Sequence, residues 1–139
     1  MDTKSWLRAA IGAFAVVVAT DFLVHHMWLG DFYRTHAGWW RPEAEMSSMM
    51  PLMLLAQMAF AALLALVYTR GYERKKEGMA QGLRFGILMG LFVAIPHSLM
   101  TYVIYPYPEP LVWSWFMGCL LKTVLAGVAI GALYKPAKG

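Results

Sequence analysis

Four long apolar runs limit what this chain can fold into more than any other feature of the sequence. They cover residues of about 6–29, 51–69, 83–105 and 111–134. Each run approaches or exceeds the roughly 20 residues that an α-helix needs to cross about 30 Å of hydrocarbon. Because lipid offers the backbone no hydrogen bonds, each run is expected to be helical. The sequence therefore predicts an all-α, polytopic membrane protein in which residues 1–139 form a single four-helix transmembrane domain.

The composition supports the same class. Charged residues make up 14% of the chain and hydrophobic residues 60%, whereas an ordinary soluble domain is about a quarter charged. The first run follows Lys4 and Arg8, as a signal peptide would, but it is too long for one and contains Asp21, so we interpret it as a retained helix. Cys119 is the only cysteine, which excludes an intramolecular disulfide and a cysteine-based metal motif.

The distribution of positive charge predicts the orientation of the helices. Arg34 and Arg41 lie on one side of the expected membrane, and nine of the twelve Lys and Arg lie on the other: Lys4, Arg8, Arg70, Arg74, Lys75, Lys76, Arg84, Lys135 and Lys138. The positive-inside rule then places both termini in the cytoplasm. We interpret the basic stretch 69–84 as a topology signal over anionic headgroups rather than a nucleic-acid-binding surface. The expected location is the bacterial inner (cytoplasmic) membrane.

Small residues recur at intervals of four in the last two runs. They are Gly78 and Gly82 just before the third run, Gly86 and Gly90 within it, and Gly127 and Gly131 in the fourth run. This spacing lets two helix backbones approach closely, so it predicts a tight helix–helix contact. The pattern leaves open whether the neighbouring helix belongs to the same chain or to another. A weak similarity between residues 7–25 and 83–101 is compatible with a duplicated helical hairpin.

Each apolar run places a polar side chain in its predicted outer half at a similar depth, and the four lie within roughly two helical turns of one another: Asp21, Gln57, His97 and Lys122. A charged group near mid-bilayer costs about 2.5 kcal/mol or more. We therefore expect this layer to turn inward and its members to pair with one another. His97 follows Gly90 by seven residues, which predicts that it shares the glycine face of its helix.

Three interpretations of this layer remain open. Asp21 and Lys122 can form a buried ion pair that fixes which helices meet. Asp21 and His97 can belong to a proton or ion path. Either charged residue can instead contact a polar group of another subunit. His97 by itself is typical of a hydrogen-bonded packing histidine.

Histidines and methionines near the outer side raise the question of a metal or haem. A haem with two histidine ligands could use His97 with His25 or His26. Copper is suggested by thioether and imidazole groups, since four methionines near His25, His26 and His36 have the spacing of one helical face: Met46, Met49, Met50 and Met53. A helix that begins at Pro51 would remove the first three from that face. The sequence assigns no cofactor, and haem and copper both stay open.

Part of the chain resembles an uncharacterised family of small four-helix bacterial membrane proteins. The similar segments are "QGLRFGILMGLFVAIPHSLMTYVIYP", "GVAIGALYKP" and, more loosely, "LGDFY". The resemblance implies the four-helix fold and no particular activity. This chain has His25 and His26 where members of that family often have Trp-Tyr.

No catalytic motif is present in the sequence, which predicts that the protein is not an enzyme. The first functional hypothesis is a non-catalytic accessory or assembly subunit of a larger inner-membrane complex, such as an electron-transfer complex. Its expected partners are the lipid bilayer and other membrane subunits or a second copy, without nucleic acid. The alternative is a small transporter or a copper- or haem-handling protein that uses the polar layer and the outer histidines and methionines.

Overall fold

The computed structural model describes residues 2–137, and these residues contain helices and no strand. Its four long helices are α1 (Thr3–Phe22), α4 (Met50–Arg70), α5 (Gly78–Ile104) and α6 (Glu109–Leu133). A π-helical segment, η1 (Leu23–Trp28), continues α1, and three short helices connect it to α4: α2 (Gly30–Thr35), η2 (Ala37–Trp39) and α3 (Glu43–Ser48). Within this described part of the chain, four helices, counting α1 with η1 as one, are long and apolar enough to cross a membrane. The predicted all-α, four-helix organisation is thereby confirmed; Lys138 lies outside the described residues.

The start of α5 differs from the prediction for a local reason. The helix begins at Gly78, five residues before the apolar run at 83, because Glu77 caps it. The Glu77 carboxylate accepts hydrogen bonds from the backbone N–H groups of Met79, at 2.8 Å, and Ala80. Such a cap satisfies backbone donors that have no partner inside the helix. Capping chemistry thus extends the helix past the apolar boundary.

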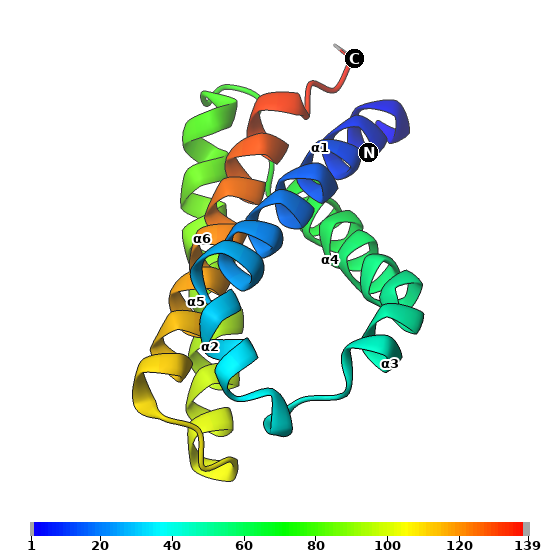
Figure 1. The fold of residues 1–139 in the computed structure, drawn as a ribbon. Coiled ribbons are helices and arrows are strands. Elements are labelled where there is room, and N and C mark those ends of the chain that lie inside the picture. The colour runs from blue at the N-terminus through cyan, green and yellow to red at the C-terminus, as the bar shows by residue number, and fades with distance from the viewer. Residues whose placement is uncertain (1, 138–139) are drawn as a thin grey trace.

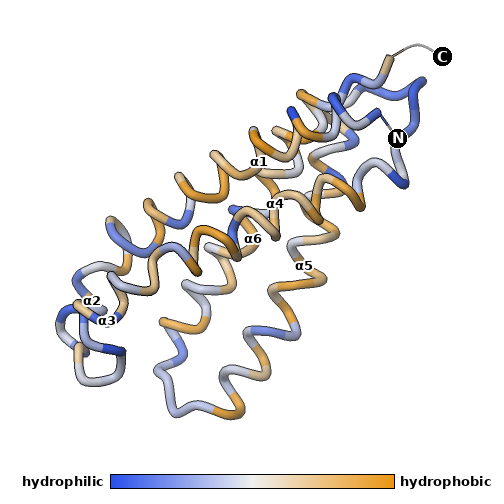
Figure 2. Tube along the Cα trace, turned by 90° about the vertical axis from the view of Figure 1, so that its right-hand side faces the viewer, coloured by the Kyte–Doolittle hydropathy of each residue, from blue (hydrophilic) through white to orange (hydrophobic). Residues whose placement is uncertain are grey.

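The helices form an unevenly packed bundle (Figure 1). α5 and α6 lie side by side, α1 packs against both α6 and α4, and α4 makes few contacts with α6 and fewer still with α5. The common core is built from small and branched side chains that are at most 1% exposed, among them Ala9, Ala13, Val17, Ala65 and Ile130. Figure 2 shows hydrophobic residues along the middle of the helices and hydrophilic residues towards both ends of the bundle.

The glycines of α5 and α6 bring these two helices into backbone contact. A methyl carbon added to Gly127 would lie 2.7 Å from the Cα of Gly86, and one added to Gly86 would lie 2.8 Å from the Cα of Val124. Gly131 faces Gly78 and Gly82 in the same way, and Gly90 faces Leu120. The helix that packs against the glycines of α5 is therefore α6 of the same chain. We call this contact the α5–α6 seam.

Both described ends of the chain meet at one end of the bundle. The Asp2 carboxylate accepts hydrogen bonds from the backbone N–H groups of Ser5, at 3.0 Å, and Ala137, at 2.9 Å. The N–H of Ala137 and then that of Ser5 stabilise the charged carboxylate, which lowers the pKa of Asp2. Arg8 Nε donates to the carbonyl of Leu133 at 3.0 Å. These contacts join the beginning of α1 to the end of α6.

Candidate functional site

Three side chains from three helices meet in the half of the bundle that carries α2 and α3, which we call the outer half. Lys122 Nζ of α6 lies 3.0 Å from Asp21 Oδ1 of α1, and Gln57 Nε2 of α4 donates to Asp21 Oδ2 at 2.7 Å. The side chains of Lys122 and Asp21 are 22% and 19% exposed. Both carboxylate oxygens therefore have partners, and the carboxylate links α1, α4 and α6. We call Asp21, Gln57 and Lys122 the polar triad.

The position of each triad residue follows from the spacing of its helix. Asp21 comes four residues after the buried Val17, and Gln57 comes four residues before the buried Ala61. Lys122 lies midway between Gly118, whose added methyl would touch Val24 of η1, and the buried Ala126. Residues four apart lie on one helical face. Asp21 and Gln57 thus continue the packed faces of α1 and α4 by one turn, whereas Lys122 lies within the packed face of α6. The triad lies between the common core and a second buried cluster, which contains Val24, Leu29 and Leu111.

Two further features describe the surroundings of the triad. The Lys122 ammonium lies 5.7 Å from the centre of the Phe60 ring, which is within range of a cation–π attraction. Gln57 Oε1 is buried and has no hydrogen-bond partner among the described residues. A buried acceptor without a partner is uncommon and costs free energy. The triad is therefore well paired at its charges and incompletely paired at one amide oxygen.

His97, the fourth residue of the predicted layer, is a correction to the sequence prediction. It is exposed on α5, whereas Ser98 beside it is buried. The packed face of α5 repeats every fourth residue: Gly82, Gly86, Gly90, Ala94 and Ser98. A residue seven beyond Gly90 is one position short of this row, and one position is a rotation of about 100°. His97 therefore points away from α6 and takes no part in the polar triad.

The other three histidines are held by separate local partners. His25 Nδ1 lies 2.8 Å from the hydroxyl of Tyr33, which also accepts a hydrogen bond from Trp115 Nε1 at 2.8 Å. The His26 ring packs against Phe22. The His36 ring stacks on Phe32 at 4.2 Å, and its Nδ1 lies 2.9 Å from the Phe32 carbonyl. These contacts hold the three rings apart rather than directing them at one point.

The four methionines do not form the single helical face that the copper interpretation needs. Met46 belongs to α3, Met49 lies between the helices, and Met50 and Met53 belong to α4. The helix is interrupted at Met49, and a new helix, α4, begins with Pro51 in its first turn. A proline is tolerated at that position because the backbone N–H that it lacks would have no partner inside the helix. Among residues 2–137, no group of three or more His, Cys, Asp or Glu side chains is placed to hold a metal ion.

Sequence reasoning missed the contacts at the outer end of the bundle. The Tyr33–Trp115 hydrogen bond joins residues 82 positions apart, and burial raises the pKa of Tyr33. The π-helical turn of η1 was also unexpected, and such turns are frequent at functional sites. Aromatic residues crowd this part of the sequence, which indicates an interfacial position. That signal does not identify which rings meet.

Comparisons with family models, with curated proteins and with solved structures found no match to this chain. The arrangement of the residues is therefore the basis for any functional argument. The polar triad offers an ion pair and an amide inside the apolar part of the bundle. It contains no nucleophile paired with a base. What it does directly is hold three helices together at one level.

Proposed function

We propose that the protein is a non-catalytic accessory or assembly subunit of a larger bacterial inner-membrane complex, such as an electron-transfer complex. The observation that carries this proposal is the state of the outer half of α4. Of residues 50–59, every one except Gln57 is exposed. The inner half of the same helix packs on α1 through Ala61, Leu64 and Ala65, which are at most 4% exposed. One half of α4 thus has a neighbour in this chain and the other half does not.

The polar triad supports a protein neighbour at this uncovered half. Gln57 is the one residue of 50–59 that is not exposed, and Figure 1 shows α4 diverging from α5 towards the N-terminal end of α4. Asp21 and Lys122 beside it keep about a fifth of their side-chain surface exposed. Charged surface in contact with hydrocarbon is costly. A helix from another subunit, packed along Met50–Ala59, would cover the triad and reduce that cost.

The proposed orientation places both termini in the cytoplasm. The two described chain ends lie at one end of the bundle, close to the α4–α5 connection (Figure 1). The basic residues counted for the positive-inside rule lie in or beside these three segments. The opposite end, with α2 and α3, then faces the periplasm.

Site-specific cross-linking tests the proposed neighbour. A photo-reactive amino acid replaces Leu55 of α4 in one variant and Leu88 of α5, which is 67% exposed, in the matched control. The expected result, in the native membrane, is a defined adduct with one other polypeptide from position 55 and no such adduct from position 88. The same polypeptide should be retained on purification in a mild detergent. Lipid adducts alone from both positions, with a monodisperse monomer after purification, would overturn the proposal.

A small transporter is the second candidate, and the ion pair within the span favours it. Asp21 and Lys122 are paired at 3.0 Å yet remain partly accessible, as residues of a proton or ion path must be. The test is proton flux into liposomes that contain the purified protein, followed with a pH-sensitive dye. Flux that Asp21→Asn abolishes would support transport; flux equal to that of protein-free liposomes would remove this candidate.

A further inference from the structure

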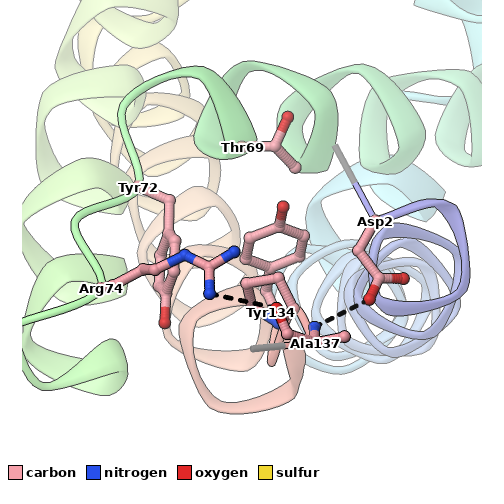
Figure 3. A pocket seen from close by; sticks show the side chains of 7 residues that line it. Asp2, Thr69, Tyr72, Arg74, Tyr134 and Ala137 are labelled. Atoms are coloured by element: carbon pink, nitrogen blue, oxygen red, sulfur yellow. Dashed lines mark hydrogen bonds between the residues drawn. The ribbon is translucent and has the colours of Figure 1, made fainter. Parts of the chain in front are cut away.

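A pocket of about 500 Å³ opens at the end of the bundle where the chain ends meet (Figure 3). Thr69 at the end of α4 and Tyr72 and Arg74 from the following connection line one side. Tyr134, Ala137 and Asp2 line the other. None of these residues belongs to the polar triad or to the uncovered half of α4. The pocket is therefore a separate feature of the molecule.

Two side chains of the lining, Arg74 and Tyr134, have hydrogen-bond donors that are not used. The Arg74 guanidinium carries five N–H donors, and Nη1 is bonded to the Ala137 carbonyl at 3.1 Å. The carboxylate of Asp2 already accepts from two backbone N–H groups, one at each oxygen. The hydroxyl of Tyr134 makes no hydrogen bond to residues 2–137, although the residue lines the pocket. The lining holds one positive and one negative side chain, Arg74 and Asp2, and the Asp2 carboxylate is bonded to backbone N–H groups on the α1–α6 side. The unused N–H groups of Arg74 and the hydroxyl of Tyr134 suit an anion with several oxygens.

The pocket also lies where a lipid could reach it. It is at the basic end of the bundle, which the positive-inside rule assigns to the cytoplasmic side of the membrane. Leu66 and Met58 precede Thr69 by three and eleven residues, so they lie on its side of α4. Leu66 is half-buried and Met58 is 50% exposed. Leu66 and Met58 therefore offer apolar surface to acyl chains on the same side of α4 as the pocket.

We propose that this pocket binds the phosphate of an anionic phospholipid headgroup, with Arg74 as the charged donor and Tyr134 as a hydroxyl donor. The headgroup would join the end of α4 to the segment that follows α6. This inference requires the helices to span a membrane but does not require a partner subunit. Its failure and the failure of the proposed function are therefore distinguishable.

The test measures lipid binding to the full chain in a non-ionic detergent, where no anionic surface attracts lipid at long range. Phosphatidylglycerol is titrated in, and bound molecules are counted by native mass spectrometry. Phosphatidylcholine reports on any binding that does not need an anionic lipid. The variants are Arg74→Gln and, as a control with the same change of charge outside the pocket, Lys75→Gln. Inorganic phosphate at millimolar concentration distinguishes a soluble phosphate source from a lipid.

The affinity for phosphatidylglycerol should fall by about tenfold or more in Arg74→Gln, as for loss of a charge-assisted hydrogen bond. Lys75→Gln should change it by less than about twofold. Equal losses in the two variants, or no loss in either, would overturn the proposal. Displacement of the lipid by inorganic phosphate, or equal binding of phosphatidylcholine, would also overturn it.

A second variant keeps the test decisive if Arg74→Gln does not fold, since Arg74 also holds Ala137. Tyr134→Phe removes one hydroxyl and leaves the ring that packs against Tyr68 and Tyr72. It should weaken phosphatidylglycerol binding by about threefold, as for loss of one neutral hydrogen bond. Unchanged binding in Tyr134→Phe would then count against the proposal.

Discussion

The α5–α6 seam and the polar triad hold helices together in opposite ways. Along the seam the backbones touch, because Gly82, Gly86 and Gly127 have no side chain to keep them apart. At the triad the helices are linked by long side chains that reach a common carboxylate. The seam repeats at every turn, from Gly78 to Gly90. The triad occupies a single level.

This difference explains why the bundle is closed on one side and open on the other. Apolar side chains gain little from meeting each other in lipid, so helices pair either by close backbone approach or by polar groups. A row of glycines lets two helices pack closely along several turns. A single polar layer fixes one crossing point, so the buried residues of α4 lie between Ala61 and Tyr68, and residues 50–59 are exposed except for Gln57. The seam joins α5 and α6 along several turns, and the triad leaves the first half of α4 exposed, which is the surface where we propose that another helix packs.

The largest expected effect comes from breaking the seam. Gly127→Val would place carbon atoms within 2.7 Å of the Gly86 backbone, so the helices must separate. We expect a loss of about 4 kcal/mol in the free energy of unfolding, measured by titration with denaturing detergent. Gly71→Ala is the control, because nothing lies within 4 Å of the added carbon. Equal stability of the two variants would contradict the close contact described above.

The next largest effect comes from breaking the triad. Lys122→Met leaves the Asp21 carboxylate mostly enclosed without its counter-charge, which we expect to cost about 3 kcal/mol. This value is at the lower end for a buried pair because both side chains keep some exposure. The double variant Asp21→Asn, Lys122→Met should recover most of the loss, since no unpaired charge remains. A double variant as unstable as the sum of its single variants would show that the two residues do not interact.

The two regions also differ in how far the sequence could predict them. The glycine row and the polar triad each rest on a strong local rule: glycine permits backbone contact, and a charge in an apolar helix needs a partner. From these rules, Gly82 and Gly127 could be predicted to lie at a helix–helix contact, and Asp21 and Lys122 could be predicted to pair. The rules did not fix the exact face of a helix. His97 was misplaced because a spacing of seven and a spacing of eight point about 100° apart on α5.

The outer connection could not be predicted from local rules at all. Its short helices and the π-helical η1 determine where His25, Tyr33 and His36 point. Tyr33 meets Trp115 only after η1 and α6 have packed together. No period or motif in residues 29–49 encodes that encounter. Individual contacts there depend on the finished fold, whereas the helices and the triad follow from the energetics of each segment.

Tyr33→Phe is expected to have a smaller effect, near 1 kcal/mol, because it removes the hydroxyl shared by His25 and Trp115. The pH dependence gives a second measurement. Burial raises the pKa of Tyr33 in the folded protein, so the unfolded chain releases this proton first as the pH rises. The stability from this group is complete below about pH 10 and is lost as the pH rises towards the folded-state pKa. Tyr33→Phe should remove this part of the loss of stability at alkaline pH. If the free energy of unfolding depended on alkaline pH in the same way in the variant and the original protein, the predicted role of Tyr33 would be wrong.

The smallest effect should come from His97, and it sharpens the comparison most directly. His97→Leu places an apolar side chain at an exposed position of α5, so stability should change by no more than about 0.5 kcal/mol. Ala94→Leu is the matched substitution on the packed face, where Ala94 is 0% exposed, and it should cost about 2 kcal/mol through overpacking. Both values come from the same unfolding titration. A larger loss of stability in His97→Leu than in Ala94→Leu would mean that the packed row of α5 runs through His97. The face of α5 that contacts α6 would then differ from the one described above.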